Sequence, residues 1–270
     1  RLTYLPGRVA QVDWASCGTV RVGSPVRRLS CFVMVACHSR AIYLEFTLSE
    51  RIDAFLECHV NAFRFLGGVP RRAIYDNLKS VVAERRGREI RFNSRFREFA
   101  GHYLIEPVAC NPASGWEKGR VENGIQYIRK SFLAGRTFED FDAVSAAALR
   151  WRDEVANVRL HQSTRRRPID LLVEERAHLR PLPSTPAETD TILSVKATSQ
   201  YRVPFDGNLY SVPCRLAHRP LTLRASTRRV QILDAEEEVA RHTRSYERGK
   251  DIFLAEHDRA TRERPLARAG

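Results

Sequence analysis

The sequence has no pair of cysteines at the C-x-x-C spacing of structural zinc sites, although it contains six cysteines. Cys31 and Cys37 fall inside apolar runs, and we expect them to be small core residues. No stretch has the pattern of a secretory signal or a membrane span, and no internal repeat is visible. These absences argue against a zinc-stabilised fold and a membrane partner, and they favour a reduced, cytoplasmic protein.

Positive charge is abundant. Lys and Arg number 45 against 32 Asp and Glu, which gives a formal net charge of +13. The basic residues recur along the whole chain, and most of them are arginines, which pair well with phosphate oxygens. A polyanion partner such as nucleic acid is therefore expected, although many arginines can also serve to solubilise a surface. The 270 residues suffice for one large domain and a smaller one, and the start at Arg1 suggests a segment of a longer protein.

Three carboxylates stand where a fold could bring them together. Asp13 ends the apolar-alternating run 9–12, and Asp76 ends the run 72–75. Glu122 lies in the glycine-broken stretch 115–123, which leads into a predicted helix. Strand ends and a helix can hold such groups rigidly, and magnesium prefers hard oxygen ligands. We interpret Asp13, Asp76 and Glu122 as one divalent-metal site for phosphoryl transfer on DNA.

Each of these carboxylates has a simpler interpretation. Asp13 could be a surface acid at a strand end, and Asp76 could cap the next segment because Asp-Asn is typical of turns. Glu117 competes with Glu122, but it lies nearer the loop. Glu122 is favoured because it adjoins apolar residues that would hold its helix against a sheet.

Several residues near these acids are candidates for DNA contact. Trp116 could stack on a base, although core packing is the simpler interpretation. His161 could orient DNA or a carboxylate, although a structural histidine is the simpler interpretation. The basic candidates could bind phosphates without reading sequence, or could form a solvated face. They are Lys79, Lys118, Arg120, Arg129, Lys130, Arg165, Arg166 and Arg167.

The apolar periodicity predicts alternating strands and helices, and therefore an α/β layer with helices on both faces of a mixed sheet. Ser49 is a candidate N-cap for the first helix, and Pro107 favours an edge position for its strand. Residues 77–91 are basic and are expected to be irregular. The predicted strands are 8–14, 29–37, 41–46, 73–75 and 104–109; the predicted helices are 50–66, 94–103, 117–132, 139–158 and 168–172.

The proline-rich stretch 180–186 predicts a linker. Beyond it the pattern changes to period two, with a turn predicted at 205–208 between two strands. We therefore predict a catalytic core over 1–180, a linker over 181–190, a small β-barrel over 191–246 and a basic tail over 247–270.

Three short motifs, taken in their order along the chain, resemble those of a known protein family. Val-Asp-Trp at 12–14, Tyr-Asp-Asn at 75–77 and Gly-Arg-Val-Glu-Asn at 119–123 resemble the DDE triad of retroviral-integrase-like transposases. The IstA class of insertion-sequence transposases is the most similar. Trp151, Asn157, Arg159, His161 and Pro168 resemble the segment after the catalytic glutamate, and residues 208–213 resemble the start of the following β-barrel in that class.

The resemblance implies an RNase H-like core and DNA transposition with Mg²⁺, for which Mn²⁺ could substitute. Water would cleave the transposon end, and the freed 3′ hydroxyl would attack target DNA without a covalent protein intermediate. It further implies an AAA+ ATPase helper, a homo-oligomer assembled on DNA, and a bacterial nucleoid location.

The sequence departs from the family pattern in two respects. Glu122 follows Asp76 by 46 positions, a longer gap than retroviral integrases have. No N-terminal helix-turn-helix is visible, which agrees with a segment of a longer protein. A nuclease or resolvase that only hydrolyses DNA, and a non-catalytic DNA-binding assembly module, remain alternatives.

Overall fold

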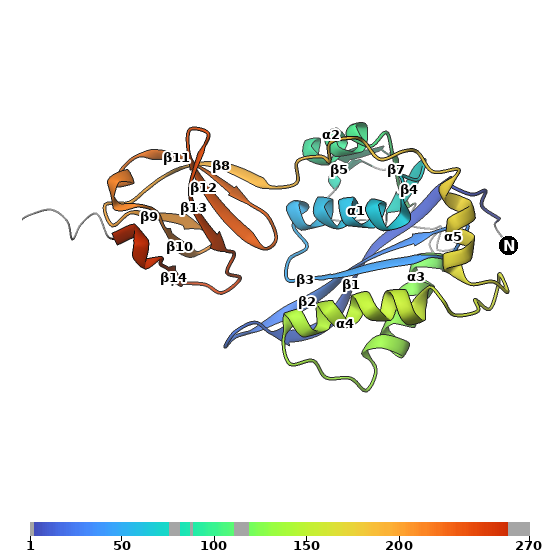
Figure 1. The fold of residues 1–270 in the computed structure, drawn as a ribbon. Helices are drawn as coiled ribbons and strands as arrows, with labels where there is room; N and C mark the ends of the chain where they lie inside the picture. The colour runs from blue at the N-terminus through green and yellow to red at the C-terminus, as the bar shows by residue number, and fades with distance from the viewer. Residues whose placement is uncertain (1–2, 76–81, 87–88, 111–118, 259–270) are drawn as a thin grey trace, which may run out of the picture. The chain divides into compact units, whose positions relative to one another are not determined.

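The computed structural model describes residues 3–75, 82–86, 89–110 and 119–258. The chain divides into two compact units, Arg1–Glu188 and Thr189–Gly270 (Figure 1). None of the helices in the described part of the chain has the length and apolar content needed to span a bilayer.

A five-stranded mixed sheet forms the centre of the first unit. Its order is β3-β2-β1-β4-β7. The first three strands pair antiparallel, whereas β4 pairs parallel with β1 and β7 pairs parallel with β4. Pro107 lies in the edge strand β7, which confirms the edge position predicted for its strand. The strands are β1 (Val9–Arg21), β2 (Val26–Ala36), β3 (Ile42–Thr47), β4 (Arg72–Tyr75) and β7 (Glu106–Ala109).

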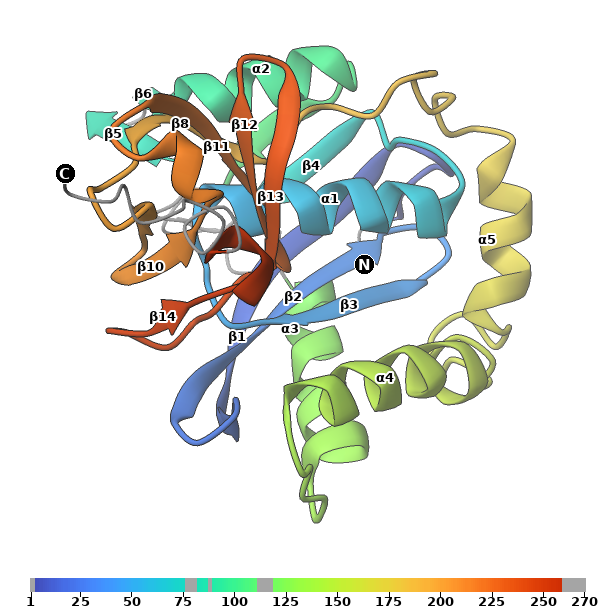
Figure 2. The same ribbon diagram turned by 60° about the vertical axis from the view of Figure 1, so that its left-hand side comes forward.

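Helices cover both faces of this sheet, as the sequence predicted. Figures 1 and 2 show α1 and α2 on one face and α3 and α4 on the other. The helices α3 and α4 each continue into a π-helix. The bounds are α1 (Ile52–Leu66), α2 (Ser94–His102), α3 (Gly119–Tyr127) with its π-helix Ile128–Leu133, α4 (Phe141–Trp151) with its π-helix Arg152–Ala156, and α5 (Pro168–Arg176).

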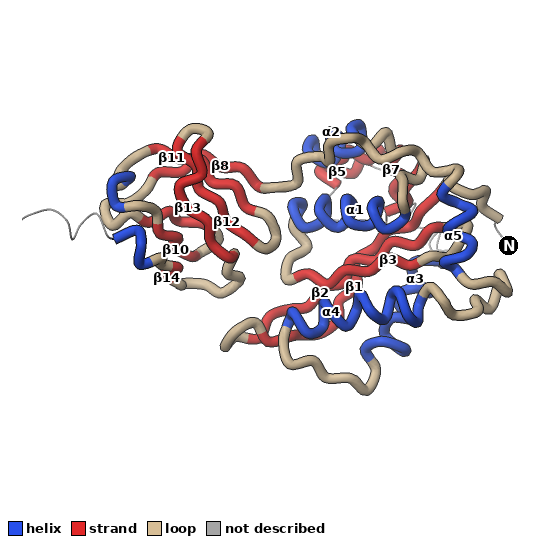
Figure 3. Tube along the Cα trace, viewed as in Figure 1, coloured by secondary structure: helices blue, strands red, loops and turns tan. Residues whose placement is uncertain are grey.

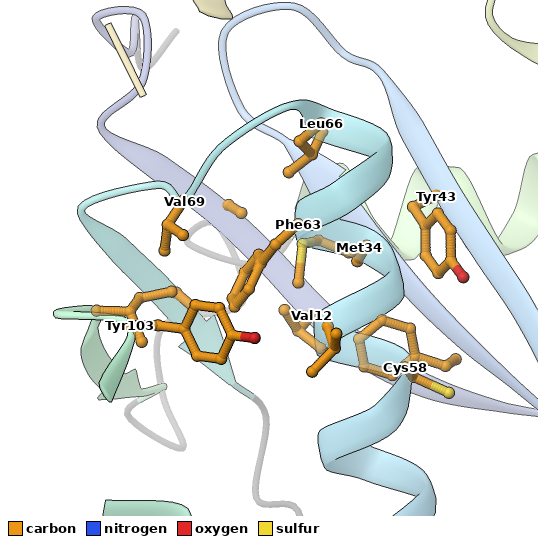
Figure 4. Packing of buried hydrophobic residues seen from close by; sticks show 14 of the residues in the cluster. Val12, Met34, Tyr43, Cys58, Phe63, Leu66, Val69 and Tyr103 are labelled. Atoms are coloured by element: carbon orange, nitrogen blue, oxygen red, sulfur yellow. The ribbon is translucent and has the colours of Figure 1, made fainter. Parts of the chain in front are cut away.

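Strand β2 is buried on both faces, because its apolar residues alternate between two cores. Met34 packs with Val12 and Phe63 on the α1 side, where Figure 4 shows all three. Val33 and Val35 pack with the α3 and α4 side chains on the other. The α3 segment buries four apolar residues at helical spacing, namely Val121, Ile125, Ile128 and Phe132.

Two local predictions were wrong. Ser49 does not cap α1, which begins after Arg51; the Ser49 hydroxyl instead accepts a hydrogen bond from the Arg51 N–H at 3.2 Å. The basic stretch after β4 is not irregular throughout, because β5 (Val82–Arg86) and β6 (Glu89–Phe92) pair antiparallel. Cross-strand pairing can stabilise a hairpin without a continuous apolar face, so composition alone did not reveal it.

A histidine lies at the centre of the aromatic core between α1 and the sheet. His59 is fully buried, and its Nδ1 donates to the Phe55 carbonyl oxygen at 2.8 Å. Its Nε2 therefore accepts from the Tyr75 hydroxyl at 3.1 Å. Burial lowers the pKa of His59 to about 4. This pair connects α1 to the last residue of β4.

The burial of His59 predicts that the first unit loses stability in acid. The folded state keeps His59 neutral down to about pH 4, whereas the unfolded chain protonates it below its ordinary pKa of 6.5. Stability should therefore fall as the pH drops from about 6.5 to about 4, by at most roughly 3 kcal/mol from this residue. Urea denaturation at several pH values would measure the fall, which His59→Gln should reduce. His102→Gln, a change at an exposed histidine, should leave it intact. Equal pH profiles for parent and His59→Gln would contradict the prediction.

The proline-rich segment at the end of the first unit packs against the rest of that unit. The Thr185 carbonyl oxygen contacts His102 Nε2 at 2.9 Å, and the Ala187 N–H lies 3.4 Å from the Tyr103 hydroxyl. An isolated bridge pairs Arg180 with Val69. The proline-rich connection therefore packs along α2 and the end of α1.

The second unit is built of strands, as predicted (Figure 3). Its described strands form a four-stranded sheet, β13-β12-β11-β8, and a three-stranded sheet, β14-β10-β9. The predicted turn joins β9 to β10 through Asp206 and Gly207, both at positive φ. The strands are β8 (Thr191–Lys196), β9 (Arg202–Phe205), β10 (Asn208–Ser211), β11 (Pro220–Ala225), β12 (Arg229–Asp234), β13 (Glu237–Thr243) and β14 (Asp251–Ile252).

Candidate active site on the central sheet

A buried glutamine of β1 fixes the start of α3. Gln11 Oε1 accepts hydrogen bonds from the backbone N–H groups of Arg120 at 3.1 Å and Val121 at 3.0 Å. The first N–H groups of a helix have no partner within the helix, so a side chain usually caps them. Here the cap comes from a strand more than a hundred residues away, which ties the beginning of α3 to β1.

Asp13 lies on the same face of the sheet as Gln11. Side chains two residues apart in a strand point the same way, and Asp13 pairs across the sheet with Val33. Val33 belongs to the core beneath α3 and α4. The Asp13 side chain is half-buried, and its Oδ1 accepts from the Trp14 N–H at 2.8 Å. The predicted position of Asp13 on a strand is therefore confirmed, although β1 continues beyond it to Arg21.

Glu122 lies in the first turn of α3, with an exposed side chain. The glycine that follows it at position 124 brings the helix close to the sheet. A Cβ at Gly124 would lie 3.1 Å from Val35 Cγ2 and 3.9 Å from Val33 Cγ1. These two valines pair with Gln11 and Asp13. The helix that carries Glu122 therefore packs on the face of the sheet that carries Asp13.

The other members of the predicted site lie outside the described residues. They are Asp76, Lys79, Trp116, Glu117 and Lys118. The described part of β4 ends at Tyr75, which pairs in parallel register with Val12, the residue before Asp13. Among the described residues, no three His, Cys, Asp or Glu side chains are grouped so that they could hold a metal ion.

The described basic candidates have different surroundings. Arg129 and Lys130 are exposed on the π-helix after α3, and Arg129 Nη2 donates to the Ser16 carbonyl oxygen at 3.3 Å. Arg166 pairs with Glu174, and Arg167 pairs with Asp170 through two hydrogen bonds of 2.7 and 2.9 Å. The carboxylates raise the pKa of both arginines.

Arg120 and His161 point to a different place from Glu122. Arg120 donates to the Cys37 carbonyl oxygen, and its guanidinium lies 4.1 Å from the centre of the Tyr4 ring. His161 Nδ1 accepts from the Ser163 N–H at 3.3 Å. Both line a cavity together with Arg40 and Arg159. Arg40 was not among the candidate site residues predicted from the sequence, and Arg159 was identified there only as part of a motif.

Two protein-family descriptions match the chain. The integrase core domain matches residues 4–114, and the C-terminal domain of Mu transposase matches residues 182–254. The putative transposase for insertion sequence IS5376 of Geobacillus stearothermophilus is 35% identical over 208 residues, which are 77% of this chain and 50% of that protein. The chain therefore carries an integrase core domain and is similar to insertion-sequence transposases.

Other transposases are also similar to this chain. A transposase of Aminobacter aminovorans is 33% identical over 93% of this chain and 49% of its own length. The transposase for insertion sequence IS21 of Pseudomonas aeruginosa is 29% identical over 90% of this chain and 62% of its own length. The chain thus spans about half the length of the first two relatives. The predicted resemblance to IstA-class transposases is confirmed.

Among solved structures, the catalytic core domain of HTLV-2 integrase is 17% identical, with a TM-score of 0.46. The match covers 63% of this chain and 99% of that one.

Proposed function

We propose that this chain is the catalytic part of a DNA transposase that cleaves the 3′ ends of an insertion sequence and joins them to target DNA. The observation that carries the proposal is the double hydrogen bond from α3 to Gln11. It fixes the Glu122 helix on the strand face that carries Asp13. Similarity to insertion-sequence transposases supports the reaction type.

We assign Asp13, Asp76 and Glu122 as the ligands of divalent metal ions, Mg²⁺ with Mn²⁺ able to substitute. The described carboxylates fit this chemistry, because both Asp13 and Glu122 supply hard oxygen donors on one side of the sheet. Such ions, when bound, stabilise negative charge on the attacking and leaving oxygens of phosphoryl transfer. The parallel register of Val12 and Tyr75 supports the inclusion of Asp76.

The protein's own residues would position the DNA for this chemistry. Arg129 and Lys130, exposed on the continuation of α3, are suited to contact backbone phosphates on either side of the scissile bond. Lys79, Lys118 and the segment 165–167 are further candidates for such contacts. Because none of these contacts reads a base, recognition of the transposon end requires other residues.

The wider assembly follows from the same proposal. Residues 1–180 would be the catalytic core and 181–190 the connection, with the second unit, which includes β14, as an accessory DNA-binding part. Copies of the chain would assemble on transposon-end and target DNA, with an AAA+ ATPase as helper, in the bacterial cytoplasm at the nucleoid.

A labelled insertion-sequence-end duplex, incubated with the chain, the helper ATPase and Mg²⁺ or Mn²⁺, tests this function. Cleaved and joined products are expected from the parent. Asp13→Asn, Asp76→Asn and Glu122→Gln should each lower both by about a thousandfold or more, with DNA binding retained. Cleavage without joining would identify a nuclease instead. Full activity in any of the three variants would remove that residue from the site.

A further inference from the structure

A second candidate site lies in the first unit, in a cavity of about 900 Å³. Four parts of the chain meet there: the N-terminal residues, the connection from β2 to β3, helix α3, and the segment between the second π-helix and α5. Its described lining includes Arg40, Arg120, Arg159, Arg166, His38 and His161.

The cavity is strongly basic. Four arginines and two histidines line it, and none of its described lining residues is Asp or Glu. Arg166 pairs with Glu174 outside this lining, so Arg40, Arg120 and Arg159 supply its positive charge. Arg159, Arg40 and Arg120 all act on His161, whose pKa falls to about 4 through burial first and then through these three positive charges. Three guanidinium groups from distant parts of the sequence therefore converge on one imidazole.

Two of these guanidinium groups are held in place by aromatic rings. Arg120 lies 4.1 Å from the Tyr4 ring centre, and Arg159 lies 3.9 Å from the Tyr127 ring centre. Each also donates to a backbone carbonyl oxygen. An arginine that is already ordered loses less side-chain entropy when it binds a ligand, so the cavity is preorganised.

Arg40 reaches the cavity from an unusual backbone conformation. It lies in the tight connection between β2 and β3 with φ of 65°, in the left-handed region that residues other than glycine rarely adopt. Its N–H donates to the Ala36 carbonyl oxygen at 3.0 Å, which closes the turn. Such conformations gather at functional sites, because the surrounding structure must stabilise them.

We propose that this cavity binds a phosphate group. The grouped guanidinium groups and the imidazole of His161 match the donor set that phosphate oxygens require. The phosphate could belong to a DNA backbone or to a small phosphate compound. The DNA source rests on the proposed function, whereas phosphate binding itself does not.

A phosphate in this cavity would be distinct from the one at the proposed metal site. Arg120, Asn123 and Gly124 are three and four residues apart and share one side of α3, the side that lines the cavity. Glu122 is two residues from Arg120, which places it on the other side of the helix at about 100° per residue. The helix α3 therefore separates the two sites.

Calorimetry with inorganic pyrophosphate tests the cavity, in buffer containing EDTA so that no metal site contributes. Arg40→Asn removes one guanidinium while keeping a residue that tolerates positive φ. It should weaken binding about tenfold or more, as expected for the loss of a charge-assisted hydrogen bond. The control Arg150→Gln removes the same charge from an exposed position on α4 and should not change affinity. Equal weakening in both variants, or no binding to the parent, would overturn the proposal.

A second measurement needs no substitution. Proton resonances of His161 in the parent protein, followed against pH, should show that pyrophosphate raises its pKa above the value of about 4, because the bound anion stabilises the imidazolium. An unchanged His161 titration at saturating pyrophosphate would also overturn the proposal.

Competition distinguishes the two sources. If the phosphate belongs to DNA, a duplex should displace pyrophosphate, and Arg40→Asn should bind DNA more weakly than Arg150→Gln. If pyrophosphate binds but DNA does not displace it, the ligand is a small phosphate compound. Repeating the binding with Glu122→Gln separates this site from the proposed active site, since that change should abolish cleavage and leave pyrophosphate binding intact.

Discussion

Replacing Gln11 by leucine is expected to lower metal-dependent DNA cleavage about a hundredfold while leaving DNA affinity unchanged. The substitution removes the acceptor of two backbone hydrogen bonds, at 3.1 and 3.0 Å, that hold the start of α3. Glu122 lies in that first turn, and a shift of about 1 Å in a catalytic group can cost that much in rate. Gln11 would act through the position of Glu122 and is a positioning residue.

The experiment compares cleavage rates, DNA affinity and thermal unfolding of Gln11→Leu with those of Gln126→Leu. The control makes the same chemical change on an exposed residue of the same helix. Gln11→Glu, which keeps oxygen acceptors for the two N–H groups, should preserve the fold of α3. A folded Gln11→Leu protein with the parental cleavage rate would show that the cap does not position Glu122.

Replacing Glu175 by alanine should destabilise the first unit by about 2–6 kcal/mol. Glu175 on α5 is 1% exposed, and its two carboxylate oxygens accept from the N–H groups of Gly7 at 2.9 Å and Ser39 at 3.0 Å. Truncation leaves two buried donors without an acceptor, and each such donor costs about 1–3 kcal/mol. The effect is large because one side chain joins the N-terminal segment, the β2–β3 connection and α5.

Urea denaturation followed by tryptophan fluorescence measures this effect in the first unit, because Trp14, Trp116 and Trp151 all belong to it. Glu174→Ala, at the adjacent exposed carboxylate, is the matched control and should change the midpoint little. A loss of stability in Glu175→Ala no larger than in the control would show that the two buried hydrogen bonds are replaced elsewhere.

Local apolar patterns predicted most of the elements of the first unit. Strand β2 could be predicted because its burial on two faces leaves a continuous apolar run, and α3 because its buried residues recur at helical spacing. The position of Asp13 on a strand was predictable from the apolar-alternating run that precedes it. The π-helices after α3 and α4 were not predictable, since a single widened turn leaves no distinct local pattern.

Contacts between distant polar residues could not be predicted. Gln11, Asn157 and Glu175 are buried and satisfy backbone groups more than a hundred residues away, yet in sequence each is an ordinary polar residue. The basic cavity was missed for the same reason. Arg40 and Arg159 approach each other only after four separate segments have folded together.

Both edges of the five-stranded sheet carry a residue that hinders a further strand. At the β3 edge, the Asn157 amide takes both backbone groups of Ile42, accepting from its N–H at 2.8 Å and donating to its carbonyl oxygen at 2.9 Å. At the β7 edge, the N–H groups of Glu106 and Cys110 point inward to β4, so the outward nitrogens between them are those of Pro107 and Ala109. Pro107 has no hydrogen to donate, so only Ala109 could donate to a further strand there. An added strand would lose hydrogen bonds at either edge, as in proteins protected against edge-to-edge aggregation. We therefore expect copies of this unit that assemble to contact one another through helices or loops, and not through pairing between the strands of two sheets.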